Sequence, residues 1–269
     1  MEKKRVLFIS QEITPYLPES EMSKISRCLP QGIQEKGREI RTFMPRYGSV
    51  NERRNQLHEV IRLSGMNLVI NDADHPLIIK VASIQTARMQ VYFIDNEDYF
   101  QRKNVLKDNK GVEFEDNDER AVFFARGVLE TVIKLRWAPD LIHCHGWLAS
   151  LVPLYIKKAY HDEPLFENSK VVYSVYDEPY SSLLSASVKE HVKIDGIKDE
   201  DIELLGEPAY DSMVKLGIQH ADAIIQGSEK VNPEFLSFAD QCNKPRLAYH
   251  PEETYVDAYN DFYNKVLEK

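Results

Sequence analysis

The chain has 269 residues, of which 43% are hydrophobic and 29% are charged. A chain of this length and composition folds into one large domain or two small ones and buries a sizeable core without disulfides or metals. Its formal net charge is −9 at pH 7, and its basic residues are interleaved with acidic ones. Because a nucleic-acid-binding surface needs clustered lysine and arginine, the sequence argues against DNA or RNA as a partner.

The cysteines and the N-terminus indicate the compartment. Cys28, Cys144 and Cys242 are odd in number and form no Cys-x-x-Cys pair, which is typical of reduced thiols in a cytosolic protein. The apolar run at 6–9 is too short for a signal peptide, and no apolar stretch approaches the roughly 20 residues that cross a bilayer. We expect a cytoplasmic protein that does not contact a membrane.

The first elements in chain order predict a βαβ unit. Residues 5–10 are dense in Val, Leu, Phe and Ile, as buried parallel strands are. Apolar residues spaced three or four apart predict a helix over 22–33, with a kink at Pro30 because proline removes a backbone donor. Gly37 fits the end of this helix, and 39–44 is predicted as the second strand. Such units build parallel sheets.

The next segment changes in character. Short strand-like stretches within 49–94 predict a hairpin or meander added to the main sheet, whereas 95–117 is polar and is predicted as loop. A strong helix follows over 117–136, for which Asp116 and Glu119 are expected to form a capping box. The predicted alternation of strands and helices is therefore interrupted once, by residues 49–117, before it continues in the second half of the chain.

The alternation of strand and helix then resumes and continues to the C-terminus. The predicted fold is therefore α/β, with a doubly wound, mostly parallel, Rossmann-like sheet, and such folds bind ligands beyond the carboxyl ends of their strands. A final helix, Tyr255–Leu267, is expected to pack back on the domain. The other predicted elements of this half are strands at 140–145, 171–176 and 221–226 and helices at 147–160 and 210–220.

The loop after the first strand is the place where a nucleotide-binding fold holds phosphate. Such a loop needs glycines, so that the backbone can approach the anion. Residues 11–21 contain no glycine and carry Glu12, Glu19 and Glu21, whose carboxylates repel a pyrophosphate. The sequence therefore argues against nucleotide binding through this loop.

Titratable groups follow two later strands. A strand directs His143 and His145 to one face and Cys144 to the other, and no further ligand with zinc-like spacing lies nearby. We therefore predict no metal site and expect both histidines to be hydrogen-bonded and partly buried. Asp177 and Glu178 are adjacent in a later loop, so we expect them to be solvated rather than to form an acid/base pair.

Taken in order, several strings resemble the N-terminal, starch synthase catalytic domain of bacterial glycogen and starch synthases. These are glycosyltransferases of family 5 with the GT-B fold, and the resemblance implies glucose transfer from ADP-glucose. It covers the chain to about residue 238, and each string is weak alone but specific in its order and spacing. The strings are VLFISQE at 6–12, MPRYG at 44–48, NDER at 117–120, DLIHCHGW at 140–147, LVPLY at 151–155 and KLGIQHAD at 215–222.

The departures from this family fall on its working residues. The resemblance implies a Lys-x-Gly-Gly loop that meets the sugar nucleotide, where this chain has 18–21, beginning with Pro18. The family string His-x-His-Asp-Trp has Gly146 in place of its aspartate, and the family pair His-Asn has Tyr176 in place of its histidine. With Pro18, Gly146 and Tyr176 substituted in this way, we expect no catalytic residue in the chain.

A second difference is expected in domain organisation. The resemblance implies two Rossmann-like domains, of which the C-terminal one carries most nucleotide contacts, including an Arg/Lys pair for the phosphates. We expect one synthase-like domain over 1–240 and a tail over 241–269 whose helix packs back on it. About 30 residues are too few for another such domain. The chain is therefore expected to lack the nucleotide-binding half and to hold no cofactor.

Three hypotheses for the function follow. The first is a stand-alone, non-catalytic relative with a regulatory or binding role in glucan metabolism, and the second is half of a split glucosyltransferase that a separate chain completes. The third hypothesis is a sugar- or glucan-binding module, whose candidate residues are Glu12, His145, Tyr176, Asp177 and Tyr180.

Two kinds of partner are expected. One is a glucan or sugar ligand. The other is a partner protein or a second copy of the chain, which would bind the surface that faces the second domain in the family.

Overall fold

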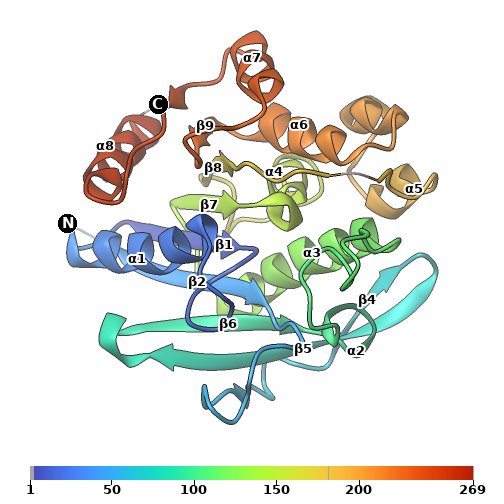
Figure 1. The fold of residues 1–269 in the computed structure, drawn as a ribbon, viewed down its shortest axis with the longest axis horizontal. Helices are drawn as coiled ribbons and strands as arrows, with labels where there is room; N and C mark the ends of the chain where they lie inside the picture. The colour runs from blue at the N-terminus through green and yellow to red at the C-terminus, as the bar shows by residue number, and fades with distance from the viewer. Residues whose placement is uncertain (1–2, 181, 269) are drawn as a thin grey trace.

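The computed structural model describes residues 3–180 and 182–268. Its centre is one mixed, mostly parallel sheet with helices on both faces (Figure 1), which confirms the predicted α/β class. Within the described residues the strand order is β10-β9-β8-β7-β1-β2-β6-β5-β3, and β4 pairs with β5 off this path. The strands are β1 (Arg5–Ser10), β2 (Glu39–Pro45), β3 (His58–Glu59), β4 (Met66–Ile70), β5 (Ala73–Ile84), β6 (Met89–Asp95), β7 (Leu141–His145), β8 (Lys170–Val175), β9 (Ala223–Gln226) and β10 (Arg246–Leu247).

Helices enclose the sheet on two sides. Side chains alternate along β1, so Val6 and Phe8 face the core under α1 and α8, while Leu7 and Ile9 face the larger core under the other helices. No helix among the described residues is long and apolar enough to cross a membrane. The helices are α1 (Glu21–Glu35), α2 (Glu97–Phe100), α3 (Asn117–Leu135), α4 (Leu151–Lys157), α5 (Val188–Val192), α6 (Tyr210–His220), α7 (Pro233–Gln241) and α8 (Tyr255–Leu267), with short 3-10 segments η1 (Gln85–Ala87), η2 (Trp147–Ala149) and η3 (Asp199–Gly206).

The parallel strands end together at one edge of the sheet. Strand β1 lies between β2 and β7 and is parallel to both. In the register, Ser10 pairs with His145, which pairs with Ser174, and Val175 pairs with Gln226. The ends of β1, β7, β8 and β9 therefore form one rim, the carboxyl edge, where the loops that follow these strands meet.

The segment before α3 forms the predicted addition to the sheet. Strands β5 and β6 are antiparallel, and β6 in turn lies parallel to β2. Strands β3 and β4 pair with the two halves of the long β5. These strands extend the sheet beyond β2, on the side opposite to β7, β8 and β9 (Figure 1).

Helix α1 starts at the carboxyl edge, directly after the loop that follows β1. Ser20 caps it, because its hydroxyl accepts from the backbone N–H of Ser23 while the Ser23 hydroxyl accepts from the Ser20 N–H. The helix runs through Pro30 and continues to Glu35, and Gly37 follows with a φ of 90°. Because Ser20 is already used as a cap, the start of α1 is satisfied by its own side chains.

The predicted capping box of α3 is wrong. Asp116 stands at the N-cap but its side chain caps no backbone N–H. Its carboxylate instead accepts from the Arg102 guanidinium, with 2.6 Å between Nη2 and Oδ2, while Glu119 accepts from the Tyr99 hydroxyl at 2.8 Å. A bidentate pair of opposite charges is stronger than a single cap bond, which explains why Asp116 turns away from the helix.

Two further elements differ from the sequence prediction. The helix predicted over 147–160 is divided into η2 and the shorter α4, which ends at Lys157. Helix α7 was not predicted, although Asn232 caps it and Pro233 occupies its first turn, both of which are start signals for a helix. The short strand β10, which pairs with β9, was also not predicted.

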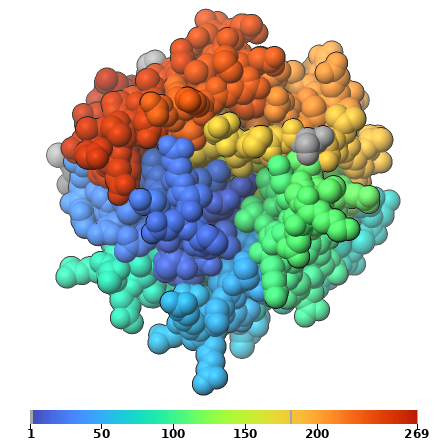
Figure 2. Space-filling view, in the orientation of Figure 1, coloured from blue at the N-terminus to red at the C-terminus, as the bar shows by residue number. Residues whose placement is uncertain are grey.

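The C-terminal helix α8 packs against α1 on one face of the sheet. Tyr259 and Tyr263 are buried there, in the same core cluster as Val6 and Phe8. Arg38 ties the helix down through Asn264, at 2.6 Å from guanidinium nitrogen to amide oxygen. Figure 2 shows the C-terminal segment lying directly against the N-terminal one on the molecular surface.

Candidate functional site

Three hollows line the carboxyl edge. The tyrosine hollow, of about 380 Å³, lies between the loop after β8 and the start of α7 and contains Tyr176, Asp177 and Tyr180. The loop hollow, of about 460 Å³, contains Glu12 and lies beside the segment that precedes α1. The terminal hollow, of about 240 Å³, lies between α1 and the segment before α8. Further lining side chains are Glu178, Asp211, Lys230 and Asn232 in the first, Pro18, Glu19, Ser20 and Lys103 in the second, and Glu21, Lys24, Tyr249, His250, Glu252 and Tyr255 in the third.

The structure brings together three of the five binding residues predicted from sequence. Tyr176, Asp177 and Tyr180 share the tyrosine hollow. Glu12 lines the separate loop hollow. His145 is fully buried and reaches no hollow, but its Nδ1 lies 2.7 Å from the Tyr176 hydroxyl. Its contribution to the site is therefore to hold Tyr176 in place.

Glu178 was expected to be solvated, and the structure corrects this expectation. Its Oε1 accepts from the Gln11 side-chain amide at 2.8 Å, and its Oε2 accepts from the backbone N–H of Trp147 at 3.1 Å. Burial, together with the nearby charge of Glu12, raises the pKa of the Glu178 carboxyl to about 7. Asp177, in contrast, is exposed.

Gln11 connects the ends of β1, β7 and β8. Its side-chain oxygen accepts from the backbone N–H of Leu148 at 3.0 Å while its amide group donates to Glu178. The Tyr47 hydroxyl donates to its backbone carbonyl at 3.1 Å. One buried glutamine therefore fixes the turn after β7 relative to the loop after β8, and this network leaves Gln11 no free side-chain oxygen or nitrogen directed at a ligand.

The two histidines of β7 serve the core. His143 Nδ1 lies 2.5 Å from the Tyr263 hydroxyl of α8, and its Nε2 lies 2.7 Å from Ser174 Oγ. The two imidazole rings are 3.8 Å apart, and burial lowers the pKa of both, that of His145 to about 3. Both rings are neutral at physiological pH, and the described residues hold no His, Cys, Asp and Glu cluster suited to a metal. Both histidines are hydrogen-bonded as expected from sequence, but they are fully rather than partly buried.

Gly146 could not be replaced by the aspartate of the family string without rearrangement. Its φ is 85° and its ψ is 172°, a conformation that other residues rarely adopt. A Cβ atom at this position would lie 2.8 Å from the sulfur of Met22 and 3.0 Å from Cβ of Gln11. The neighbouring residues thus occupy the space that a side chain at 146 would need.

Tyr176 fills a comparable space at the end of β8. Its ring packs on Gly227, where a Cβ atom would lie 2.7 Å from the ring carbons. The residue is 5% exposed and its hydroxyl bonds to His145. At the start of α1, the Ser20 hydroxyl donates to Glu12 Oε2 at 2.7 Å. At all three substituted positions, 18–21, 146 and 176, side chains of the chain itself bond or pack with one another.

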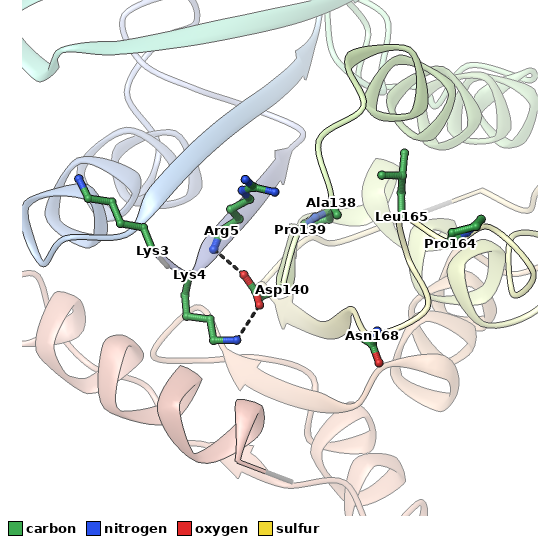
Figure 3. Close-up of a pocket in the computed structure, with 9 residues that line it drawn as sticks. All are labelled: Lys3, Lys4, Arg5, Ala138, Pro139, Asp140, Pro164, Leu165 and Asn168. Carbon is green, nitrogen blue, oxygen red and sulfur yellow. Dashed lines mark hydrogen bonds and ion pairs between the residues drawn. The ribbon is translucent and has the colours of Figure 1, made fainter. Parts of the chain in front are cut away.

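A fourth hollow lies at the opposite edge of the sheet, where the strands begin (Figure 3). This amino hollow has a volume of about 240 Å³ and is lined by Lys3, Lys4, Arg5 and Asp140. Asp140 accepts from the Lys4 ammonium at 2.7 Å and from the Arg5 backbone N–H at 2.8 Å. Lys4 and Asp140 form an ordinary ion pair there. The amino hollow lies away from the loop that carries Glu178, the carboxyl group with the raised pKa.

Sequence reasoning missed several of these residues. Gln11 directly follows the first strand, and Asp211 and Asn232 stand near the starts of α6 and α7. Position after a strand or before a helix was a usable signal for each. The partial burial of Glu178 left no such signal, because it depends on the Gln11 and Trp147 contacts across the sheet.

Comparison with known proteins identifies the family. The starch synthase catalytic domain family matches residues 5–244 of the chain. The chain belongs to this family. The matched part of this starch synthase family domain runs from β1 through α7, whereas β10 and α8 lie beyond it.

Relatives of this starch synthase family domain include bacterial glycogen synthases. That of Chlorobium luteolum is 34% identical over 234 residues, which are 86% of this chain and 47% of that protein. That of Chlorobaculum tepidum is 34% identical over 265 residues, 98% of this chain and 52% of that protein. The chain thus spans about half the length of these relatives.

A solved structure supports the fold. The catalytic domain of starch synthase IV from Arabidopsis thaliana, bound to ADP and acarbose, superimposes with a TM-score of 0.75 at 17% sequence identity. The match covers 92% of this chain and 51% of that one. The likeness establishes that this starch synthase family domain has the fold of the matched half of that chain.

Proposed function

We propose that this domain is a non-catalytic member of the glycogen and starch synthase family, which binds an uncharged sugar or glucan at its carboxyl edge. Its role would be regulatory or binding in glucan metabolism, and it would not transfer glucose from ADP-glucose. The proposal rests on one observation above others, which is the sign of the charge in the hollows of the carboxyl edge.

Carboxylates outnumber lysines in each of these hollows, and none is lined by arginine within the described residues. A sugar diphosphate needs cations or free backbone N–H groups to offset its charge, and a departing diphosphate needs them still more. The charged side chains are Asp177, Glu178 and Asp211 against Lys230, Glu12 and Glu19 against Lys103, and Glu21 and Glu252 against Lys24.

The substituted positions support the same conclusion. Met22 and Gln11 take the space beside Gly146, and Tyr176 packs on Gly227. Restoring the aspartate at position 146 would therefore require Met22 and Gln11 to move. A chain in which such neighbours have adapted to the substitutions is better explained by a role without glucose transfer than by a catalytic role with weakened contacts.

The tyrosine hollow has the chemistry for a sugar. The Tyr180 ring is stacked on Tyr210 with ring centroids 4.6 Å apart, which holds it in a fixed orientation at the wall. Asp177, Asp211 and Asn232 offer acceptors and donors for hydroxyl groups around it. Because sugars combine apolar ring faces with many hydroxyls, such a mixture of aromatic and planar polar side chains suits them. Of ADP and acarbose, the two ligands of the Arabidopsis structure, we propose that this domain accepts only the saccharide type.

Thermal stability and transfer assays on the purified chain test this proposal. A ligand that binds only the native state raises the melting temperature, so maltoheptaose is expected to raise it and ADP-glucose at the same concentration is not. Tyr180→Ala is expected to reduce the shift by maltoheptaose, while Glu200→Gln, an exposed residue of η3, preserves it. Glucose transfer from ADP-glucose to maltoheptaose would refute the proposal.

A further inference from the structure

The segment that follows the family match builds a hollow of its own. Tyr249, His250 and Glu252 lie beyond residue 244, where the match ends, and they face Glu21 of α1 across the terminal hollow. Gly227, from the loop after β9, also lines it. The hollow therefore joins the part of the chain that the family model matches to the segment beyond residue 244.

Aromatic and polar groups alternate around this hollow. Tyr255 is buried at its wall, and Tyr249 is half-buried, with partial burial and the negative charge of Glu21 raising the pKa of its hydroxyl. The Lys24 ammonium lies 3.5 Å from Glu252 Oε2, so one carboxylate is partly neutralised across the hollow. His250 Nδ1 lies 3.5 Å from the Thr254 hydroxyl. Two rings and both donors and acceptors of hydrogen bonds are thus available within one small space.

The size and charge of the terminal hollow define the ligand. Its volume of about 240 Å³ is below the roughly 300–1,000 Å³ of sites for drug-sized ligands, which suits a single ring rather than a long chain. The two negative charges of Glu21 and Glu252 exceed the single positive charge of Lys24, so the hollow disfavours an anion.

We propose that the terminal hollow is a subsite for one uncharged sugar ring, which binds between α1 and the 249–255 segment. The proposal rests on the proposed function, since it assumes that this chain binds saccharides, and it adds a second site that the family match does not contain. A sugar there contacts α1 on one side and the segment leading into α8 on the other. Its binding therefore stabilises the packing of α8 against α1.

Hydrogen exchange measured by mass spectrometry locates this site. Maltose is expected to slow backbone exchange in 249–267, because bound ligand opposes local opening of this segment. Tyr249→Phe keeps the ring and removes the hydroxyl that faces the hollow, and Tyr249→Ala removes both. Each is expected to weaken the protection by maltose, the second by about tenfold in affinity, which corresponds to a lost contact of roughly 1.4 kcal/mol.

Three variants complete the design. Glu252→Gln keeps the size of the side chain and tests the polar wall without removing a ring, so that a folding defect of Tyr249→Ala does not leave the question open. Tyr180→Ala alters only the tyrosine hollow and is expected to preserve maltose protection of 249–267. Asp261→Asn, on the exposed side of α8, serves as the matched control and is expected to behave as the parent chain does.

The possible outcomes are distinct. If calorimetry detects maltose binding but 249–267 shows no protection, the terminal subsite is refuted while the proposed function stands. If neither method detects maltose, both proposals fail. If spermidine protects the segment and maltose does not, the hollow is a cation site and the inferred ligand class is wrong.

Discussion

The two edges of the parallel sheet differ in charge and in the state of their polar groups. At the amino edge, Lys3, Lys4 and Arg5 surround the single carboxylate of Asp140, which is paired with Lys4 and with backbone. At the carboxyl edge, carboxylates prevail in all three hollows. Glu178 there has a pKa raised to about 7, and Gly146 has a φ of 85°.

This difference shows which edge carries the function. Ion pairs at the surface are ordinary features of a soluble domain and contribute little. Perturbed carboxyls and backbone in rarely populated regions cost free energy and concentrate where a protein binds or acts. Residues with positive φ stand at both edges, since Gly37 precedes β2 and Gly146 follows β7, so the raised pKa of Glu178 is what distinguishes the carboxyl edge. The hollow with most cations is therefore not the candidate site, even though an anion would prefer it.

The largest effect is expected at Gly146. We predict that Gly146→Asp, which restores the family residue, lowers the free energy of unfolding by about 3 kcal/mol, because it adds strain at positive φ and a clash with Met22. Gly37→Ala is the matched control, since Gly37 has a φ of 90° but a Cβ atom added there would meet no other atom within 4 Å. Urea unfolding of both variants measures the difference. Equal losses in the two would show that the neighbours of Gly146 impose no packing constraint.

A smaller effect is expected from the ionisation of Glu178. Burial raises the pKa of this carboxyl to about 7 from 4.5, so the folded state favours the protonated form. Stability from this group is complete below about pH 4.5 and is lost as the pH rises through about 7. Between pH 6 and 8 the parent chain should lose about 1 kcal/mol of unfolding free energy relative to Glu178→Gln. If the unfolding free energies of the two proteins changed with pH in the same way, Glu178 would be exposed to solvent, and the prediction would be wrong.

The smallest effect is expected at the amino edge. Asp140→Asn removes the ion pair with the exposed Lys4 and should cost less than about 1 kcal/mol, decreasing further in high salt. Its unfolding free energy should show the same dependence on pH between 6 and 8 as that of the parent chain. A loss larger than that of Gly146→Asp would reverse the contrast between the two edges.

Much of the fold follows from the sequence because the buried strands are dense in apolar residues. The 5–10 strand and the amphipathic helices were found in this way, and the parallel topology then placed the candidate site at the ends of the strands. Local sequence patterns gave a wrong prediction where a partner outside the local pattern determines the contact of a side chain. Asp116 has the position of a cap, but Arg102 binds it instead.

The site was less predictable than the fold for the same reason. Tyr176, Asp177 and Tyr180 share one loop, so sequence proximity brought them together. His145 was predicted as a binding residue but lies beneath the surface, because Tyr176 covers it. The terminal hollow joins Glu21 to Tyr249 across most of the chain, and no local pattern indicates such a contact.

Calorimetric titration of one preparation with maltoheptaose and with ADP-glucose tests the central claim most directly. The carboxylates of the three hollows predict that maltoheptaose binds and that ADP-glucose gives no saturable heat under the same conditions. Repeating the titration with Tyr180→Ala assigns to the tyrosine hollow the part of the sugar heat that this variant loses. Saturable binding of ADP-glucose that is tighter than that of maltoheptaose would contradict the account.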